Sequence, residues 1–166
     1  HVVLRATEYA ELRARAWPPE TALHAHDTPE DGRTSSLLLG LAAVPQEAAV
    51  LIHPCDVPLL SASAVRRLVS AWSARTDRDL LAARLVTPGG RGGHPLLLGH
   101  TRVKEARALQ HHDSLRTLLH TDPARVLNVA HPSDPGPFLD VDTPEQLALI
   151  ESLLAESPSH SGKDQR

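Results

Sequence analysis

The chain has 166 residues, of which 41% are hydrophobic and 22% are charged, as is ordinary for one globular domain with a sizeable core. Its net charge of −3 gives no electrostatic case for nucleic-acid binding, so we expect no nucleic-acid partner. No apolar run approaches the roughly 20 residues of a membrane span, so we expect no membrane association. The single cysteine, Cys55, cannot form an internal disulfide, which favours a reducing cytoplasm.

Short apolar runs alternate with stretches of helical periodicity along the chain. In chain order we expect strands at residues 2–4, 22–26, 48–52, 80–86, 94–98, 125–129 and 138–141. Between and after them we expect helices at residues 7–16, 35–43, 101–109, 114–119 and 143–154, and one that begins at residue 61 or 63. This alternation predicts an α/β fold with a mostly parallel sheet.

Several expectations concern single elements. The run at 48–52 is continuously apolar, which is typical of a strand buried on both faces. In the last helix, the spacing of Leu147, Ile150 and Leu154 predicts that all three point inward. Residues 156–166 are polar, and we expect them to form a disordered tail after a domain at residues 1–155.

Acidic residues follow two of the expected strands. Asp56 comes just after residues 48–52, between prolines that hold it in a turn, and Asp140 and Asp142 lie at the end of residues 138–141. Ligands of open α/β sheets bind at the carboxyl ends of strands, and Mg²⁺ typically takes one or two carboxylates plus phosphates and water. A metal site for phosphoryl transfer is therefore one interpretation. The other is that Asp142 is only an N-cap or first-turn acid of the last helix.

Other chemically active side chains give weaker signals. The 11 histidines are scattered, with no zinc-binding spacing, and structural or surface roles suit most of them. Cys55 adjoins Asp56, and we interpret it as a small buried filler because nothing nearby would activate a thiolate. Arg116 could reach a phosphate or pair with a carboxylate, or be a solvated helix charge.

Four stretches carry a resemblance to a known family. They are residues 32–41 (GRTSSLLLGL), 51–60 (LIHPCDVPLL), 90–97 (GRGGHPLL) and 138–147 (FLDVDTPEQL). In that order they resemble the G-x-x-x-S-L-x-x-G-L segment, the D-x-P turn, the G-H-P loop and the D-I-D-T-P-E-D-L signature of the molybdenum cofactor guanylyl- and cytidylyltransferase-like family. Residues 114–119 resemble the helix that follows the G-H-P loop.

The resemblance implies a Rossmann-like, three-layer α/β/α sandwich and transfer of a nucleotide from CTP or GTP to a phosphorylated acceptor such as molybdopterin, with release of pyrophosphate. It implies Asp56 as a ligand of Mg²⁺, with Asp142 or Asp140 as the second acid near the metal. His94 would act on the acceptor side as an acid or base, or simply pack under its strand. The residues expected near the nucleoside are Gly32, Ser35, Ser36 and Leu37.

The family normally opens with a strand and a glycine-rich loop, L-A-A-G-x-S-x-R-M-G, that cradles the triphosphate. No stretch of this chain fits it, and residues 2–4 correspond to the family's second strand. Because the sequence starts at His1, we expect a longer natural product or processing. The loss of a central strand would expose unpaired edges, so we expect the chain made alone to be poorly soluble or inactive.

Two further classes of function compete with the enzyme. A non-catalytic remnant, binding a metal or nucleotide weakly, is favoured by the missing loop. A flavodoxin-like or receiver-like regulatory domain would also have acidic strand ends. It would need a late strand-end lysine, however, and no lysine lies between Lys104 and Lys163.

Overall fold

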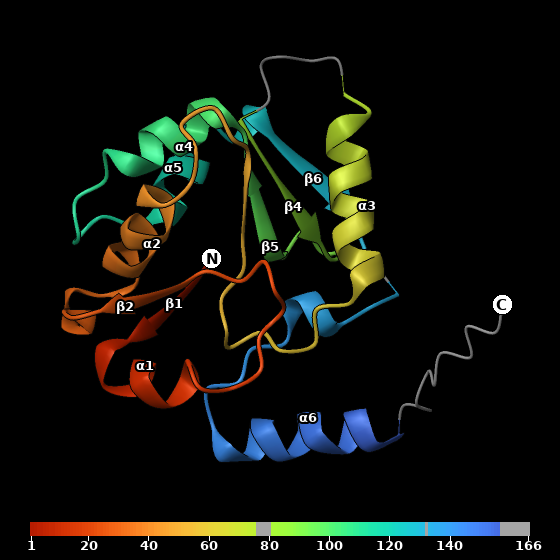
Figure 1. The fold of residues 1–166 in the computed structure, drawn as a ribbon. Helices are drawn as coiled ribbons and strands as arrows, with labels where there is room; N and C mark the ends of the chain where they lie inside the picture. The colour runs from red at the N-terminus through yellow and green to blue at the C-terminus, as the bar shows by residue number, and fades with distance from the viewer. Residues whose placement is uncertain (76–80, 132, 157–166) are drawn as a thin grey trace, which may run out of the picture.

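The computed structural model describes residues 1–75, 81–131 and 133–156 (Figure 1). The strands are β1 (Val2–Arg5), β2 (Leu23–His26), β3 (Val50–Ile52), β4 (Ala82–Val86), β5 (Gly92–Leu98) and β6 (Val126–Ala130). The helices are α1 (Ala6–Leu12), α2 (Arg33–Ala42), α3 (Ala62–Ser73), α4 (His100–Arg107), α5 (Leu115–Thr121) and α6 (Pro144–Glu156). Three short 3₁₀ turns complete the chain, namely η1 (Pro29–Asp31), η2 (Pro123–Arg125) and η3 (Gly136–Phe138). The alternation expected from the sequence is confirmed.

The larger sheet has the strand order β3-β5-β4-β6. β5 is antiparallel to both of its neighbours and β4 is parallel to β6, so three of the four strands run in one direction. α3 covers one face of this sheet, while α4 and α5 lie on the other (Figure 1). The predicted α/β fold with a mostly parallel sheet between helical layers is therefore confirmed.

The core lies on the two faces of this sheet. Side chains alternate between the faces along each strand, so Ala82 and Leu98 pack on the α4 side and Ala83 and Leu97 on the α3 side. Both alanines of β4 have no exposed surface. Small side chains in this strand leave room for the larger leucines and valines that pack around them.

A second, two-stranded sheet stands apart from the first. Among the described residues, β1 pairs in parallel with β2 and has no other partner, while β3 pairs with β5 alone. The expectation that residues 48–52 form a strand buried on both faces is wrong, because the strand is confined to Val50–Ile52 and Leu51 is 38% exposed. A central strand has neighbours on both sides, whereas β3 is an edge and leaves Leu51 partly uncovered.

The end of the chain also differs from expectation. Residues 138–141 do not form a strand, because η3 occupies Gly136–Phe138 and the following residues are irregular. Pro137 has no N–H to give to a ladder. Among the side chains of α6 whose burial the structure describes, Ile150 alone is buried, at 4% exposure, whereas Leu147 and Leu154 are 47% and 57% exposed. α6 lies away from the larger sheet (Figure 1), so its apolar spacing does not meet a core there. The predicted tail beyond residue 156 lies outside the described residues, and Glu156 itself ends α6.

No helix in the described part of the chain combines the length and apolar character that crossing a bilayer requires.

We predict that the exposed edge of β3 drives self-association. Leu51→Lys should reduce concentration-dependent association in light scattering, because a charged side chain on an edge strand opposes pairing with another chain. Val69→Lys is the matched control, since Val69 is 40% exposed but lies on α3. A chain that stays monomeric without any substitution, or that responds equally to both lysines, would contradict this.

Candidate functional site

The loop after β3 presents Asp56. Its neighbour Val57 is buried, at 3% exposure, and the ring Nε2 of His53 lies 2.8 Å from the carbonyl oxygen of Val57. This contact closes the turn, and the Asp56 side chain remains 27% exposed at its surface. Cys55 is exposed, so the expectation of a buried filler is wrong. The side chain of this turn that is buried in the protein is therefore that of Val57, not that of Cys55.

The segment before α6 is held against this loop by one backbone hydrogen bond. The N–H of Val141 donates to the carbonyl oxygen of Asp56 at 2.8 Å. Val141 lies between Asp140 and Asp142, both of which are exposed. The bond thus joins two residues that are 85 positions apart in the sequence. The structure brings all three acids that the sequence singled out to one edge of the molecule.

The interpretation of Asp142 as the N-cap of the last helix is wrong. Thr143 is the cap, because its Oγ1 accepts a hydrogen bond from the N–H of Gln146 at 3.3 Å. In return, Oε1 of Gln146 accepts from the N–H of Asp142 at 2.7 Å and from that of Thr143 at 2.9 Å. This is a reciprocal capping box, and it uses the backbone of Asp142 and not its carboxylate.

His94 lies near the start of β5, beside these acids. Burial lowers the pKa of His94 below its ordinary value of 6.5, and the nearby His53 ring, 6.4 Å away between centroids, lowers the pKa further. The charge of Asp56 raises this pKa, that of Arg33 lowers it and that of Asp140 raises it, with a net lowering. His94 is therefore mainly neutral near pH 7. Its Nδ1 atom is buried and has no hydrogen-bond partner within the described residues.

The amino end of α2 faces the same loop. Nη2 of Arg33, the first residue of this helix, lies 3.6 Å from Oδ2 of Asp56. The Arg33 side chain is 93% exposed, so this ion pair is weak and a ligand can replace it at little cost. Arg33 stands in the segment that resembles the family, yet no feature of the sequence singles out its side chain.

The residues expected near the nucleoside have mainly structural contacts. α2 begins at Arg33, two residues before the expected start at residue 35, and Gly32 is its cap, at φ 90°. The Ser35 hydroxyl donates to the carbonyl oxygen of Gly32 at 2.7 Å, and Leu37 packs against the core. Ser36 is half-buried on the first turn of the helix. The buried Thr34 donates to the carbonyl oxygen of Asp113 at 2.6 Å.

Asp134 connects the loops on either side of the site. It accepts hydrogen bonds from the Ser61 hydroxyl at 2.6 Å and from the N–H of Gly136 at 2.9 Å, while Ser61 also caps α3. Burial raises the pKa of Asp134, but hydrogen bonds from Ser61, Gly136 and His131 outweigh that effect, so this pKa is lowered overall. The loop that follows Asp56 and the loop that precedes Asp140 are thereby fixed to each other.

Among the described residues, no group of three or more His, Cys, Asp or Glu side chains is arranged to hold a metal ion. This does not conflict with magnesium, which usually keeps several waters and needs only one or two protein carboxylates beside substrate phosphates. Asp56 offers the oxygen chemistry that Mg²⁺ prefers, on a backbone fixed by Val141. The site therefore fits such an ion.

Loops at the carboxyl ends of strands are where α/β proteins bind ligands, and here these loops carry acids beside a histidine. Residues 1–131 match the family of MobA-like NTP transferase domains, and the chain belongs to that family. The bifunctional protein GlmU of Clavibacter sepedonicus is 35% identical over 88 residues, which cover 51% of this chain and 17% of GlmU. This chain therefore spans less than a fifth of that curated relative.

Solved structures share the fold. Rv0371c of Mycobacterium tuberculosis, in complex with manganese, has a TM-score of 0.71 at 21% identity, over 89% of this chain and 75% of its own. The 4-diphosphocytidyl-2C-methyl-D-erythritol synthase of Anaerococcus prevotii has a TM-score of 0.67 at 14% identity, over 92% of this chain and 77% of its own. The Rossmann-like fold expected from the resemblance is thus confirmed.

Opposite shifts in one pKa will test the surroundings of His94. In an NMR titration, the pKa of His94 should lie below 6.5, rise in His53→Gln and fall further in Asp56→Asn, because these variants remove a neighbour that lowers this pKa and one that raises it, respectively. His100→Gln, at the far end of β5, should leave it unchanged. If neither substitution changes the pKa of His94, the proposed cluster of His53, Asp56 and His94 is excluded.

The contact between the two loops can be tested through Gly136. A Cβ at this position would overlap the carbonyl oxygen of Leu59. Gly136→Ala should therefore lower the free energy of unfolding by about 2 kcal/mol in urea denaturation, as overpacking commonly does. Gly89→Ala, where the nearest atom is 3.9 Å away, is the control and should have a small effect. Equal effects of the two substitutions would refute the tight junction.

Proposed function

We propose that this chain carries the catalytic site of a Mg²⁺-dependent nucleotidyltransferase. It would move a nucleoside monophosphate from CTP or GTP to a phosphorylated small molecule such as molybdopterin. The observation that carries the proposal is the hydrogen bond between Val141 and Asp56, which places two acidic loops beside His94 and Arg33. Membership of the NTP transferase family supports the same reaction class.

In this proposal Asp56 holds Mg²⁺ together with Asp140 or Asp142. Asp140 has the additional support that its charge acts on His94. The remaining ligands would be phosphate oxygens and water. When bound, the ion would neutralise charge on the triphosphate and align it for attack.

The other residues act by position and charge. A phosphate oxygen of the acceptor forms a bond to the α-phosphorus of the triphosphate, the bond from that phosphorus to the bridging oxygen breaks, and pyrophosphate leaves. Arg33, exposed and within 3.6 Å of Asp56, is placed to exchange its carboxylate partner for a phosphate oxygen. The attacking phosphate is already ionised, so His94 need not remove a proton. As a neutral ring it can orient the acceptor with a hydrogen bond.

A second candidate is a module that binds metal and nucleotide without transferring the nucleotide. The unpaired edges of β1 and β3 favour it.

Transfer and metal binding should be measured on the same variants. With α-labelled CTP or GTP, Mg²⁺ and molybdopterin, label should appear on the acceptor, and Asp56→Asn should reduce the rate roughly 100-fold because it removes charge stabilisation of the transition state. Glu47→Gln, which loses an ion pair with Lys104 before β3, is the matched control. The second candidate predicts Mn²⁺ binding that depends on Asp56 but no transfer. Mn²⁺ binding that is unchanged in Asp56→Asn would contradict both candidates.

A further inference from the structure

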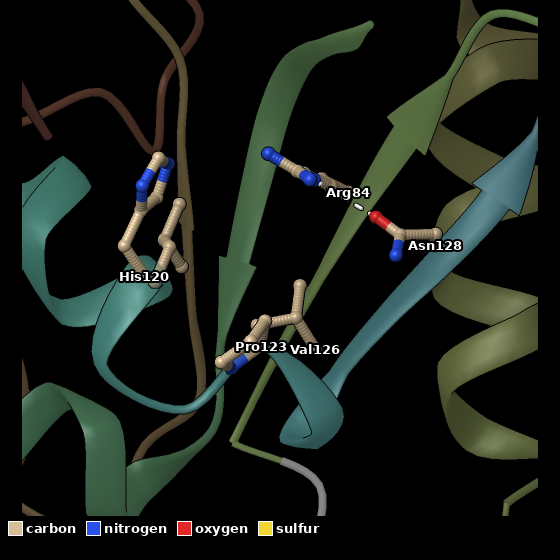
Figure 2. Close-up of a pocket in the computed structure, with 6 residues that line it drawn as sticks. Arg84, His120, Pro123, Val126 and Asn128 are labelled. Carbon is tan, nitrogen blue, oxygen red and sulfur yellow. Dashed lines mark hydrogen bonds between the residues drawn. The ribbon is translucent and has the colours of Figure 1, made fainter. Parts of the chain in front are cut away.

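A pocket opens on the sheet face that carries α5 (Figure 2). Its volume is about 270 Å³, enough for a small polar group with part of the molecule that bears it. Figure 2 shows His120 on α5 at one side, and Arg84 and Asn128 on β4 and β6 at the other. The remaining lining residues, Leu119, Pro123 and Val126, are apolar.

Arg84 is the unusual residue of this pocket. It interrupts a strand whose other members are two buried alanines, Leu85 and Val86. Arg84 is half-buried as a residue, but the hydrogen bond that its guanidinium makes is exposed, so a ligand can reach the group. The residue opposite it in the register is the neutral Asn128, whose Oδ1 accepts a hydrogen bond from Nε of Arg84 at 2.9 Å. Among the described residues, no carboxylate pairs with Arg84.

The neighbouring strand holds this side chain in place. A Cβ on Gly92 would lie only 2.7 Å from Nη1 of Arg84, so the guanidinium lies directly over a glycine of β5. Asn128 fixes the Nε side of the group. The terminal nitrogens have no hydrogen-bond partner among the described residues and present a planar fork of donors, which matches the oxygens of a carboxylate or phosphate.

Arg84 lies two strands away from the strand that leads to Asp56. Leu96 of β5 pairs with Ile52 of β3 on one side and with Arg84 of β4 on the other. Two strand spacings therefore separate the backbones of Ile52 and Arg84, which is roughly 10 Å. Asp56 follows Ile52 by four residues, in the loop after β3. An acceptor whose phosphate lies at Asp56 would have to be extended, and to cross β5, in order to reach Arg84.

We propose that Arg84, supported by Asn128 and His120, binds a second oxyanion of the acceptor, distal to the phosphate that is attacked. This assignment rests on the proposed function for the identity of the ligand, because it makes the pocket part of the acceptor site. The pocket would select acceptors that carry a carboxylate or a further phosphate at the end remote from the reacting group. The apolar walls would contact the carbon skeleton between the two charged ends.

Binding of simple anions tests the pocket without any transfer reaction. Inorganic phosphate and acetate would be titrated separately, at constant ionic strength, against the ¹⁵N-labelled chain, with the backbone amides of Leu119 and Asn128 as probes. We expect one of the two anions to shift these signals, and the anion that does so identifies the class of oxyanion. Arg84→Gln should weaken that binding roughly tenfold, and Arg84→Lys less, because lysine keeps the charge but not the fork.

Controls separate this assignment from the proposed function. Arg67→Gln, an exposed arginine on α3, should leave the affinity unchanged, and so should Asp56→Asn, which removes only the proposed metal ligand. If Arg84→Gln does not fold, Arg84→Lys and His120→Gln give the comparison. Signals that neither anion shifts, or an affinity that is the same in the Arg84 variants, would overturn the assignment whatever the transfer assay shows. Loss of transfer in Asp56→Asn with anion binding intact would support both.

Discussion

The candidate site depends on one hydrogen bond, from the N–H of Val141 to the carbonyl oxygen of Asp56. Neither acidic loop belongs to a strand, so no ladder holds them together. The bond joins two backbones, so it does not use the carboxylates of Asp56, Asp140 or Asp142. Asp134 reinforces the junction from the side by connecting the cap of α3 to the loop before η3.

Around this junction, neighbouring groups have opposite effects on the pKa of His94. Two carboxylates favour the protonated ring, whereas burial, His53 and Arg33 disfavour it and prevail. A neutral imidazole beside exposed carboxylates suits a reaction in which the protein contributes position and charge and has no proton to remove. The pocket at Arg84 follows the same principle. The hydrogen-bond partner of Arg84 is the neutral Asn128, so the charge of Arg84 stays available to bind an anion.

Much of the fold could be predicted from local chemistry. Ser61 and Ser114 stand where a helix was expected to begin, and each side chain accepts a hydrogen bond from the first turn. Asp56 could be singled out because it follows an apolar strand and lies between prolines. The failures share a cause outside local sequence. Leu51 looked buried because apolar runs usually have neighbours on both sides, but β3 has only β5.

The site was less predictable because it joins distant segments. Thr143, and not Asp142, caps the last helix because it exchanges hydrogen bonds with Gln146. The spacing of the residues alone allowed either of them to be the cap. Arg33 and Arg84 could not be distinguished from ordinary surface arginines without knowing what faces them. Arg84 did carry one signal, since a lone charge inside an otherwise apolar strand requires an explanation.

Diffraction from crystals grown with Mn²⁺ and CTP or GTP, recorded at the manganese absorption edge, would test the central claim most directly. The account predicts an anomalous peak roughly 2.1 Å from a carboxylate oxygen of Asp56, with Asp140 or Asp142 and phosphate oxygens completing the coordination. A nucleotide bound with manganese elsewhere, and Asp56 still paired with Arg33, would contradict it.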